Sequence, residues 1–251
     1  MITRFEEISM NLWPALQTVL YDGWVLRFAG GYTRRANSVN PIYQSTIDVD
    51  KKIEYCREFY ATKGMRTLFK ITNEVHPPDL DKILETKGFA REAETSVQTI
   101  GIEQIAIKDY GLVRIVTSLD DFWIDNFFRL SGAVSENKKP LKAMLKNIKM
   151  PKCFAYIKEK NAIVACGLGV LEQYVIGLFD IVVATGFRGK GFGGRILNSI
   201  LLWGKNEGAK VGFLQVMVDN KTALTLYGKI GFKEMYRYWY RVQEERALFN
   251  P

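Results

Sequence analysis

A glycine-rich segment at 185–195, set between two apolar runs, constrains the possible folds of this chain more than any other feature. The run before it, 175–183, is short and rich in β-branched residues, which predicts a buried strand. The run after it, 196–203, has apolar residues at nearly helical spacing, which predicts a helix. Together they build an anion site, because glycines let backbone N–H groups converge and the helix N-terminus adds partial positive charge. Three side chains add full positive charge at the same turn: Arg188, Lys190 and Arg195.

Two common phosphate-binding loops fit this segment poorly. A Walker loop needs Gly-Lys-Ser or Gly-Lys-Thr after a glycine and four spacer residues, and the segment has neither. Gly189, Gly191 and Gly194 match the G-x-G-x-x-G spacing of dinucleotide-binding proteins. That interpretation also requires a parallel βαβ unit and an acidic residue about 20 residues further on, whereas Glu207 is nearer and lies at the predicted helix end. The spacing of the glycines alone is therefore a weak signal.

Two segments resemble the GNAT family of acetyltransferases. Residues 188–193 (Arg-Gly-Lys-Gly-Phe-Gly) match that family's pyrophosphate loop, Arg/Gln-x-x-Gly-x-Gly/Ala. Residues 220–232 match its later helix, Asn-x-x-Ala-x-x-Leu-Tyr-x-Lys-x-Gly-Phe, in the usual order and at the usual distance. The resemblance covers about residues 111–245 and implies the GNAT acyl-CoA N-acyltransferase fold, an α/β (α+β) fold with a mixed central sheet flanked by helices. It also implies acetyl-CoA as co-substrate.

The resemblance further implies where the co-substrate binds. Main-chain amides at 188–194 receive the pyrophosphate, and the end of the strand at 175–183 pairs with the pantetheine arm like an added strand. In this family that strand and the one at 211–218 splay apart and leave a slot for the thioester. Asn220 is expected to cap the helix at 220–230 and also to touch the cofactor. The implied cofactor-binding residues are Ile181, Val182, Val183, Arg188, Gly189, Lys190, Gly191, Phe192, Gly193, Gly194, Asn220 and Tyr227.

Acetyl transfer needs a neutral amine, a group that polarises the thioester carbonyl and a proton for the leaving thiolate. The backbone N–H near Val182 or Val183 is the candidate for the second task, and Tyr227, by its motif position, is the implied general acid. Asp180 lies within an apolar strand, where an unpaired carboxylate is costly, so it is a candidate base or a ligand for a substrate cation. The alternative is that Arg195 or a buried tyrosine pairs with it. Glu172 is a lower-ranked candidate base.

Three classes of function remain to be compared. The leading hypothesis is an N-acetyltransferase that acts on a primary amine of a small molecule or peptide, by direct attack in a ternary complex. The alternative is a non-catalytic acyl-CoA-binding regulatory module. The net charge of +8 raises a third possibility, nucleic-acid binding, but no recognised motif supports it, so no nucleic-acid partner is expected.

Composition limits the chemistry and the surroundings. The single histidine, His76, and three cysteines without ligand spacing predict neither a metal site nor a histidine-based catalytic triad. The chain has no signal-peptide pattern and no apolar run near 18 residues, so we expect a cytoplasmic protein without a membrane partner. We expect a monomer or homodimer.

The first half echoes the second. Residues 80–89, which end in Lys-Gly-Phe, resemble 222–232, which end in Ile-Gly-Phe, and each segment lies between predicted strands. This predicts two tandem GNAT-like domains: a degenerate one at 1–105 and a catalytic one at 111–251. The first copy has no glycine-rich loop, so no cofactor site is expected there. Its predicted elements include helical structure over 3–21 and a hairpin that turns at 30–31.

Overall fold

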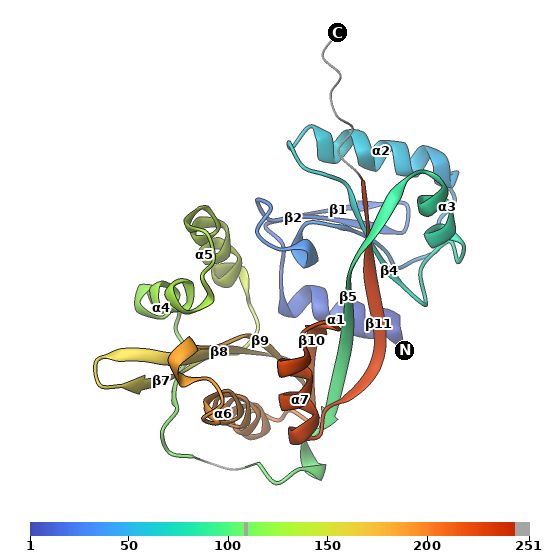
Figure 1. Ribbon diagram of the computed structural model, residues 1–251. Helices are drawn as coiled ribbons and strands as arrows, with labels where there is room; N and C mark the ends of the chain where they lie inside the picture. The colour runs from blue at the N-terminus through green and yellow to red at the C-terminus, as the bar shows by residue number, and fades with distance from the viewer. Residues whose placement is uncertain (108–109, 244–251) are drawn as a thin grey trace. The chain divides into compact units, whose positions relative to one another are not determined.

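The computed structural model describes residues 1–107 and 110–243, which form two compact units (Figure 1). Of the described residues, the first unit contains 1–10, 15–95 and 236–243, and the second contains 11–14, 96–107 and 110–235. In the described ranges, no helix is both long and apolar enough to cross a lipid bilayer.

The first unit contains four paired strands that the last strand of the chain extends. Their order is β1-β2-β3-β4-β11, in which β3 and β4 run parallel and the other described pairs are antiparallel. The elements are α1 (Ile2–Leu12), β1 (Gln17–Tyr21), β2 (Trp24–Phe28), β3 (Val39–Pro41), α2 (Val49–Ala61), β4 (Leu68–Thr72), α3 (Leu80–Thr86) and β11 (Lys233–Gln243).

Strand β4 shows how the two faces of this sheet differ. Phe69 and Ile71 enter an apolar core with Trp24 of β2, because alternate residues of a strand face the same side. Lys70 points to the other face, where its Nζ lies 2.5 Å from Glu6 Oε2 of α1. Tyr236 donates its hydroxyl to Glu6 Oε1 at 2.7 Å. This face therefore buries a paired charge rather than an apolar cluster.

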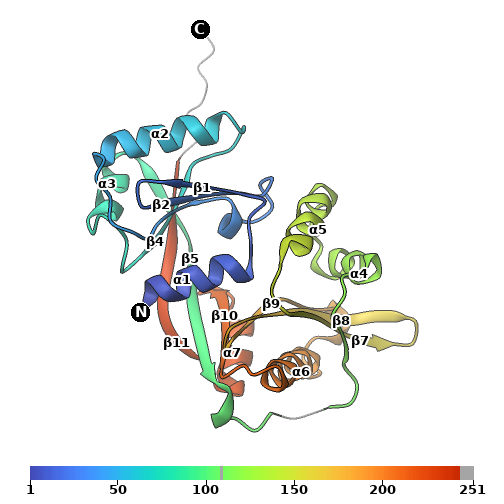
Figure 2. The same ribbon diagram turned by 180° about the vertical axis from the view of Figure 1, so that it is seen from behind.

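The second unit has a meander of antiparallel strands followed by one parallel strand. The order is β10-β9-β8-β7-β6, and the end of β5 lies next to β10. Helices α4 and α5 lie on one face of this sheet and α6 and α7 on the other (Figures 1 and 2). The elements are β5 (Phe89–Gly101), β6 (Arg114–Val116), α4 (Asp121–Ser131), α5 (Lys138–Asn147), β7 (Lys152–Glu159), β8 (Ala162–Glu172), β9 (Val175–Val183), α6 (Phe192–Asn206), β10 (Val211–Met217) and α7 (Lys221–Ile230).

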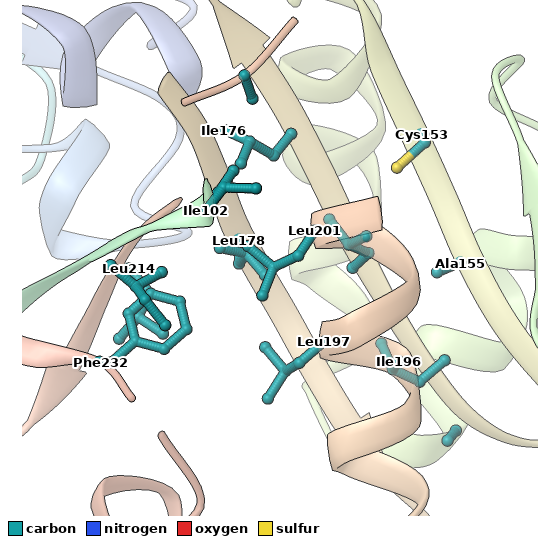
Figure 3. Packing of buried hydrophobic residues seen from close by; sticks show 14 of the residues in the cluster. Ile102, Cys153, Ala155, Ile176, Leu178, Ile196, Leu197, Leu201, Leu214 and Phe232 are labelled. Carbon is teal, nitrogen blue, oxygen red and sulfur yellow. The ribbon is translucent and has the colours of Figure 1, made fainter. Parts of the chain in front are cut away.

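Helix α6 packs tightly on strands β8 and β9. Figure 3 shows Leu197 and Leu201 of α6 beside Leu178 of β9, within one buried apolar cluster. A Cβ atom on Gly167 of β8 would lie only 2.6 Å from Ile181 Cδ1 and 2.7 Å from an α6 side chain. A glycine is therefore required at this position for the helix to approach the sheet so closely.

The compact units divide the chain at other places than the predicted domains at 1–105 and 111–251. Apart from the short stretch 11–14, one division falls inside β5, between Thr95 and Ser96, and the other inside β11, between Met235 and Tyr236. The cause is that the final strand of the chain pairs with β4 of the first unit, with Tyr238 opposite Thr72. The interpretation of the two halves as tandem copies stays a prediction.

The predicted elements of the first half are partly wrong. The helix α1 ends at Leu12, and 17–21 is a strand rather than a continuation of helical structure. One hairpin turns at Gly23. After 30–31 the chain does return to pair antiparallel with β2, but the returning strand is only Val39–Pro41, because residues 34–36 form a 3-10 turn. Gly23 has a φ of +82°, and a Cβ atom there would lie 2.1 Å from Gln44 O, so the local packing requires a glycine at this turn. The strand β2 follows this turn, and Asp48 caps α2 by accepting from Asp50 N and Lys51 N.

Candidate active site

Strands β9 and β10 separate at their carboxyl ends. Their parallel ladder covers three residue pairs, from Val175 opposite Val211 to Gly177 opposite Phe213. Beyond these pairs β9 continues to Val183 and β10 to Met217. Ligands of open α/β sheets bind outside the carboxyl ends of the strands, so the unpaired ends of β9 and β10 are the expected position of a ligand site.

A β-bulge interrupts β9 beside this opening. On β8, Cys166 and Leu168 are two residues apart, whereas their partners on β9, Val182 and Phe179, are three apart. The extra residue belongs to the stretch at Asp180, whose φ is +53°. A non-glycine residue in this conformation costs about 1–3 kcal/mol and is enriched at functional sites. The bulge re-aims the main-chain groups just before Val182 relative to the regular ladder.

The Asp180 side chain is half-buried next to the Cys166 thiol. Burial raises the pKa of Cys166, and the neighbouring Asp180 carboxylate raises it further. Cys166 is thus a neutral core residue beside the Asp180 carboxyl group. Arg195, the partner considered from the sequence, instead lies over the rings of Phe192 (5.2 Å to the centroid) and Tyr110 (5.8 Å).

The glycine-rich loop ends in a helix that no side chain caps. A short 3-10 turn (Thr185–Phe187) follows β9, and Gly189 and Gly191 then take φ values of +76° and +81°. Gly191 is the N-cap of α6 and forms no side-chain cap hydrogen bond. The first amides of a helix lack intrahelical acceptors and carry its positive dipole end. These amides and the exposed Arg188 and Lys190 make the loop a site for an anion.

Helix α7 comes close to this loop. A Cβ atom on Gly193 would lie 3.1 Å from Leu226 Cδ2 of α7 and 3.7 Å from Val183 Cγ2 of β9. The end of β9, the first turn of α6 and the middle of α7 therefore meet at one point. Tyr227 follows Leu226 in α7, and burial raises the pKa of its hydroxyl. Asn220 caps α7 as predicted, because its Oδ1 accepts a hydrogen bond from Ala223 N at 3.1 Å.

Most of the predicted site residues thus lie near the carboxyl end of β9, and one candidate base, Glu172, does not. The stretches 181–183 and 188–194 and the helix that carries Tyr227 surround the open end of β9. Glu172 is instead the last residue of β8, opposite Val175. It lies at the other end of β9, about 25 Å away at the usual rise per residue, and its Oε1 accepts a hydrogen bond from Asn11. Glu172 is therefore excluded as the base at this site.

Sequence reasoning missed the bulge. The only sequence signal at this position is a carboxylate in the middle of an apolar strand, and it indicates a role for the Asp180 side chain rather than an irregular backbone. Within the described residues, no cluster of three or more histidine, cysteine, aspartate or glutamate side chains is arranged to hold a metal ion.

Comparison with known proteins relates the whole chain to acetyltransferases. Residues 1–241 match the family model described as "Probable histone acetyltransferase Rv0428c C-terminal". The chain is 32% identical over 252 residues to a Bacillus subtilis (strain 168) protein described as "Uncharacterized N-acetyltransferase YobR", which spans 96% of this chain and 98% of that protein.

Solved structures share the fold. A "GCN5-related N-acetyltransferase from Kribbella flavida" superimposes with a TM-score of 0.74 at 12% identity, over 98% of this chain and 96% of that one. A "Tandem GNAT protein from the clavulanic acid biosynthesis pathway" gives 0.65 at 10% identity, over 95% of this chain and 87% of that one. Fold and comparisons together define a GNAT-type acyltransferase. The chain belongs to the N-acetyltransferase family that the matched model describes.

Proposed function

We propose that this protein transfers the acetyl group of acetyl-CoA to a primary amine of a small molecule or peptide, by direct attack in a ternary complex. The observation that carries the proposal is the uncapped N-terminus of α6, with Gly189 and Gly191 in left-handed conformations. This N-terminus follows directly from the strand that separates from its neighbour. A loop of this geometry offers several convergent N–H groups to a diphosphate.

The residues present fit acetyl-CoA. Amides at 188–194 bind the pyrophosphate, and Arg188 and Lys190 add charge. The backbone of Ile181 and Val182 faces the pantetheine arm on the side where β10 no longer pairs, and at Val183 the carbonyl already accepts from Arg188 Nε at 3.3 Å. Asn220 contributes by capping α7 and so fixing the helix that carries Tyr227. When bound, acetyl-CoA supplies a thioester carbonyl for the amine to attack.

Three groups of the chain then divide the chemical work. The amide near Val182, next to the bulge, donates a hydrogen bond to the carbonyl oxygen as negative charge develops there. Asp180 accepts a proton from the substrate ammonium, directly or through water, so that a neutral amine attacks. A C–N bond forms and the C–S bond breaks. Tyr227, which its raised pKa keeps protonated at neutral pH, gives a proton to the leaving thiolate. The nitrogen loses its second proton to solvent as the amide forms, and Tyr227 regains one proton from solvent.

The Tyr227→Phe variant tests this assignment. Loss of a general acid lowers turnover by about 10²–10⁴-fold, while calorimetry should show CoA affinity within about threefold of wild type. Tyr174→Phe is the matched control, because Tyr174 is 45% exposed in the β8–β9 turn and should leave turnover unchanged. The measurement is CoA release with acetyl-CoA and a panel of primary amines. CoA binding without amine-dependent release would defeat the transferase proposal and favour the acyl-CoA-binding module.

A further inference from the structure

A pocket of about 550 Å³ is lined by residues of the first unit, none of which the proposed reaction uses. Its walls come from the segment after β3 (Ser45 and Ile47) and the segment after β4 (His76 to Asp79). Because β3 and β4 are parallel neighbours, the pocket occupies the position outside strand carboxyl ends where α/β folds bind ligands. Its volume is within the range of about 300–1,000 Å³ that small-molecule sites occupy.

The wall after β3 is held rigidly. The Asp22 carboxylate accepts hydrogen bonds from Thr46 N at 2.9 Å and Ile47 N at 2.8 Å, and also from the Thr46 hydroxyl. Gly23 packs closely against Gln44 O and so also restrains the segment after β3. The pocket is therefore preformed, which reduces the entropy that a ligand must overcome.

The floor of the pocket contains a buried lysine. Lys52 is fully buried, and its Nζ lies 4.1 Å from the centroid of the Trp24 ring. Its ammonium donates to Asp22 O and to Ser45 Oγ (2.5 Å), and it lies 3.3 Å from the Asp22 carboxylate. These contacts use the three protons of Lys52. The Ser45 hydroxyl accepts one of them, and its own proton has no acceptor in the part of the chain that the structure describes.

The opposite wall offers the complementary groups. Asp79 is exposed at the start of α3 but does not use its side chain to cap that helix. His76 is half-buried, and its main chain is fixed by Trp24 Nε1 donating to His76 O at 3.0 Å. Ile47, Val49 and Ile83 supply apolar surface between these polar groups. Donors, one carboxylate and an apolar wall thus share one cavity.

The N-terminus of α2, which follows the pocket wall at Ile47, excludes a second acyl-CoA site here. Asp48 caps α2 with its own carboxylate, which accepts from Asp50 N at 3.1 Å and Lys51 N at 3.2 Å. The amides that bind a diphosphate in front of α6 are therefore occupied in front of α2. The negative charges of Asp48 and Asp50 at this end also repel a phosphate.

We propose that this pocket binds an α-amino acid with an aliphatic or aromatic side chain. The ligand carboxylate accepts from the Ser45 hydroxyl and the His76 ring, and the ligand ammonium pairs with Asp79. The ligand side chain packs on Ile47 and Ile83. Each part of such a ligand meets a group of matching chemistry, and no bond of the ligand changes.

Calorimetry on the full chain, with L-leucine and L-phenylalanine as probes, tests the proposal. We expect saturable binding, weaker by at least about tenfold for 4-methylpentanoate, which lacks the ammonium, and for isopentylamine, which lacks the carboxylate. Absence of saturable binding by both amino acids at millimolar concentration overturns the proposal. Binding of either truncated analogue as tight as that of L-leucine overturns it as well.

Variants locate the binding. Ser45→Ala and Asp79→Asn should each weaken leucine binding by about tenfold, and Ile47→Asp should abolish it. The matched control for Ile47 (40% exposed) is Val134→Asp, because Val134 is also exposed (60%) but lies in the second unit. Circular dichroism confirms that each variant is folded. Undiminished binding to Ile47→Asp assigns the amino acid to another site and refutes the proposal, whatever the transferase assays show.

Discussion

Replacing Gly191 by alanine tests the geometry on which co-substrate binding depends. Gly191 caps α6 at φ +81° and ψ 0°, and an added Cβ atom would meet nothing within 4 Å. The cost of Gly191→Ala is therefore purely that of the left-handed backbone, about 1–2 kcal/mol for an alanine. If the loop keeps its shape, the protein loses that amount of stability. If the loop relaxes instead, the same free energy appears as a loss of CoA affinity of about 5–30-fold.

Gly186→Ala is the matched control. Gly186 lies in the same loop, an added Cβ atom there also meets nothing within 4 Å, and its φ is not positive. Both variants reduce the entropy of the unfolded chain equally, so the difference between them isolates the backbone conformation of residue 191.

The assays are CoA titration by calorimetry and thermal unfolding of the two variants beside wild type. Gly186→Ala should match wild type in CoA affinity and unfold at a slightly higher temperature, because it lowers only the entropy of the unfolded chain. The reasoning is refuted if Gly191→Ala matches Gly186→Ala in both values, because a left-handed glycine would then have no energetic role in the loop.

Three further outcomes concern stability. Glu6→Gln should lower the free energy of unfolding in urea by about 3–5 kcal/mol, because Lys70 stays buried without its counter-charge. Glu6→Leu combined with Lys70→Met should recover most of that free energy. Hydrogen bonds from Ile47 N and Thr46 lower the pKa of Asp22 from 3.8 to about 2, so its stabilising effect is present above pH 4 and is lost as the pH falls toward 2. Asp22→Asn should flatten the unfolding profile in that window, and an unchanged profile would contradict the assignment. Gly167→Ala should destabilise by about 1–3 kcal/mol through its clash with Ile181, with a wild-type melting temperature as the contrary result.

The second half of the fold follows closely from local sequence signals. The glycine-rich loop, the Asn220 cap and the Gly231 end of α7 are local features, and each appears where the sequence predicts it. The first half was harder to predict because its short strands depend on distant pairing. The strand that returns to β2 is only Val39–Pro41, and it also pairs with β4 at Phe69, which no short-range pattern reveals.

The candidate site divides in the same way. Residues 188–194 and Tyr227 were identified from motif positions, and the structure brings their elements together at Gly193. The bulge at Asp180 could not be predicted, because it arises from the register between β8 and β9 rather than from either strand alone. Glu172 was predicted at the start of the strand at 175–183. It is instead the last residue of β8, and a turn that the apolar pattern does not indicate separates it from β9.

The pairing of β11 with β4 determines when, during translation, the first unit can complete its fold. Arg241 donates to Asp81 across 160 positions of sequence, and Tyr236 reaches Glu6 across 230, so the unit that begins the chain is finished by its end. During translation, residues 15–95 emerge early with β4 paired to β3 alone, and β4 gains its second neighbour only after β11 has been made. A nascent chain released before residue 236 would expose the unpaired edge of β4, so a premature stop codon near the end should yield an aggregating protein rather than a shorter enzyme.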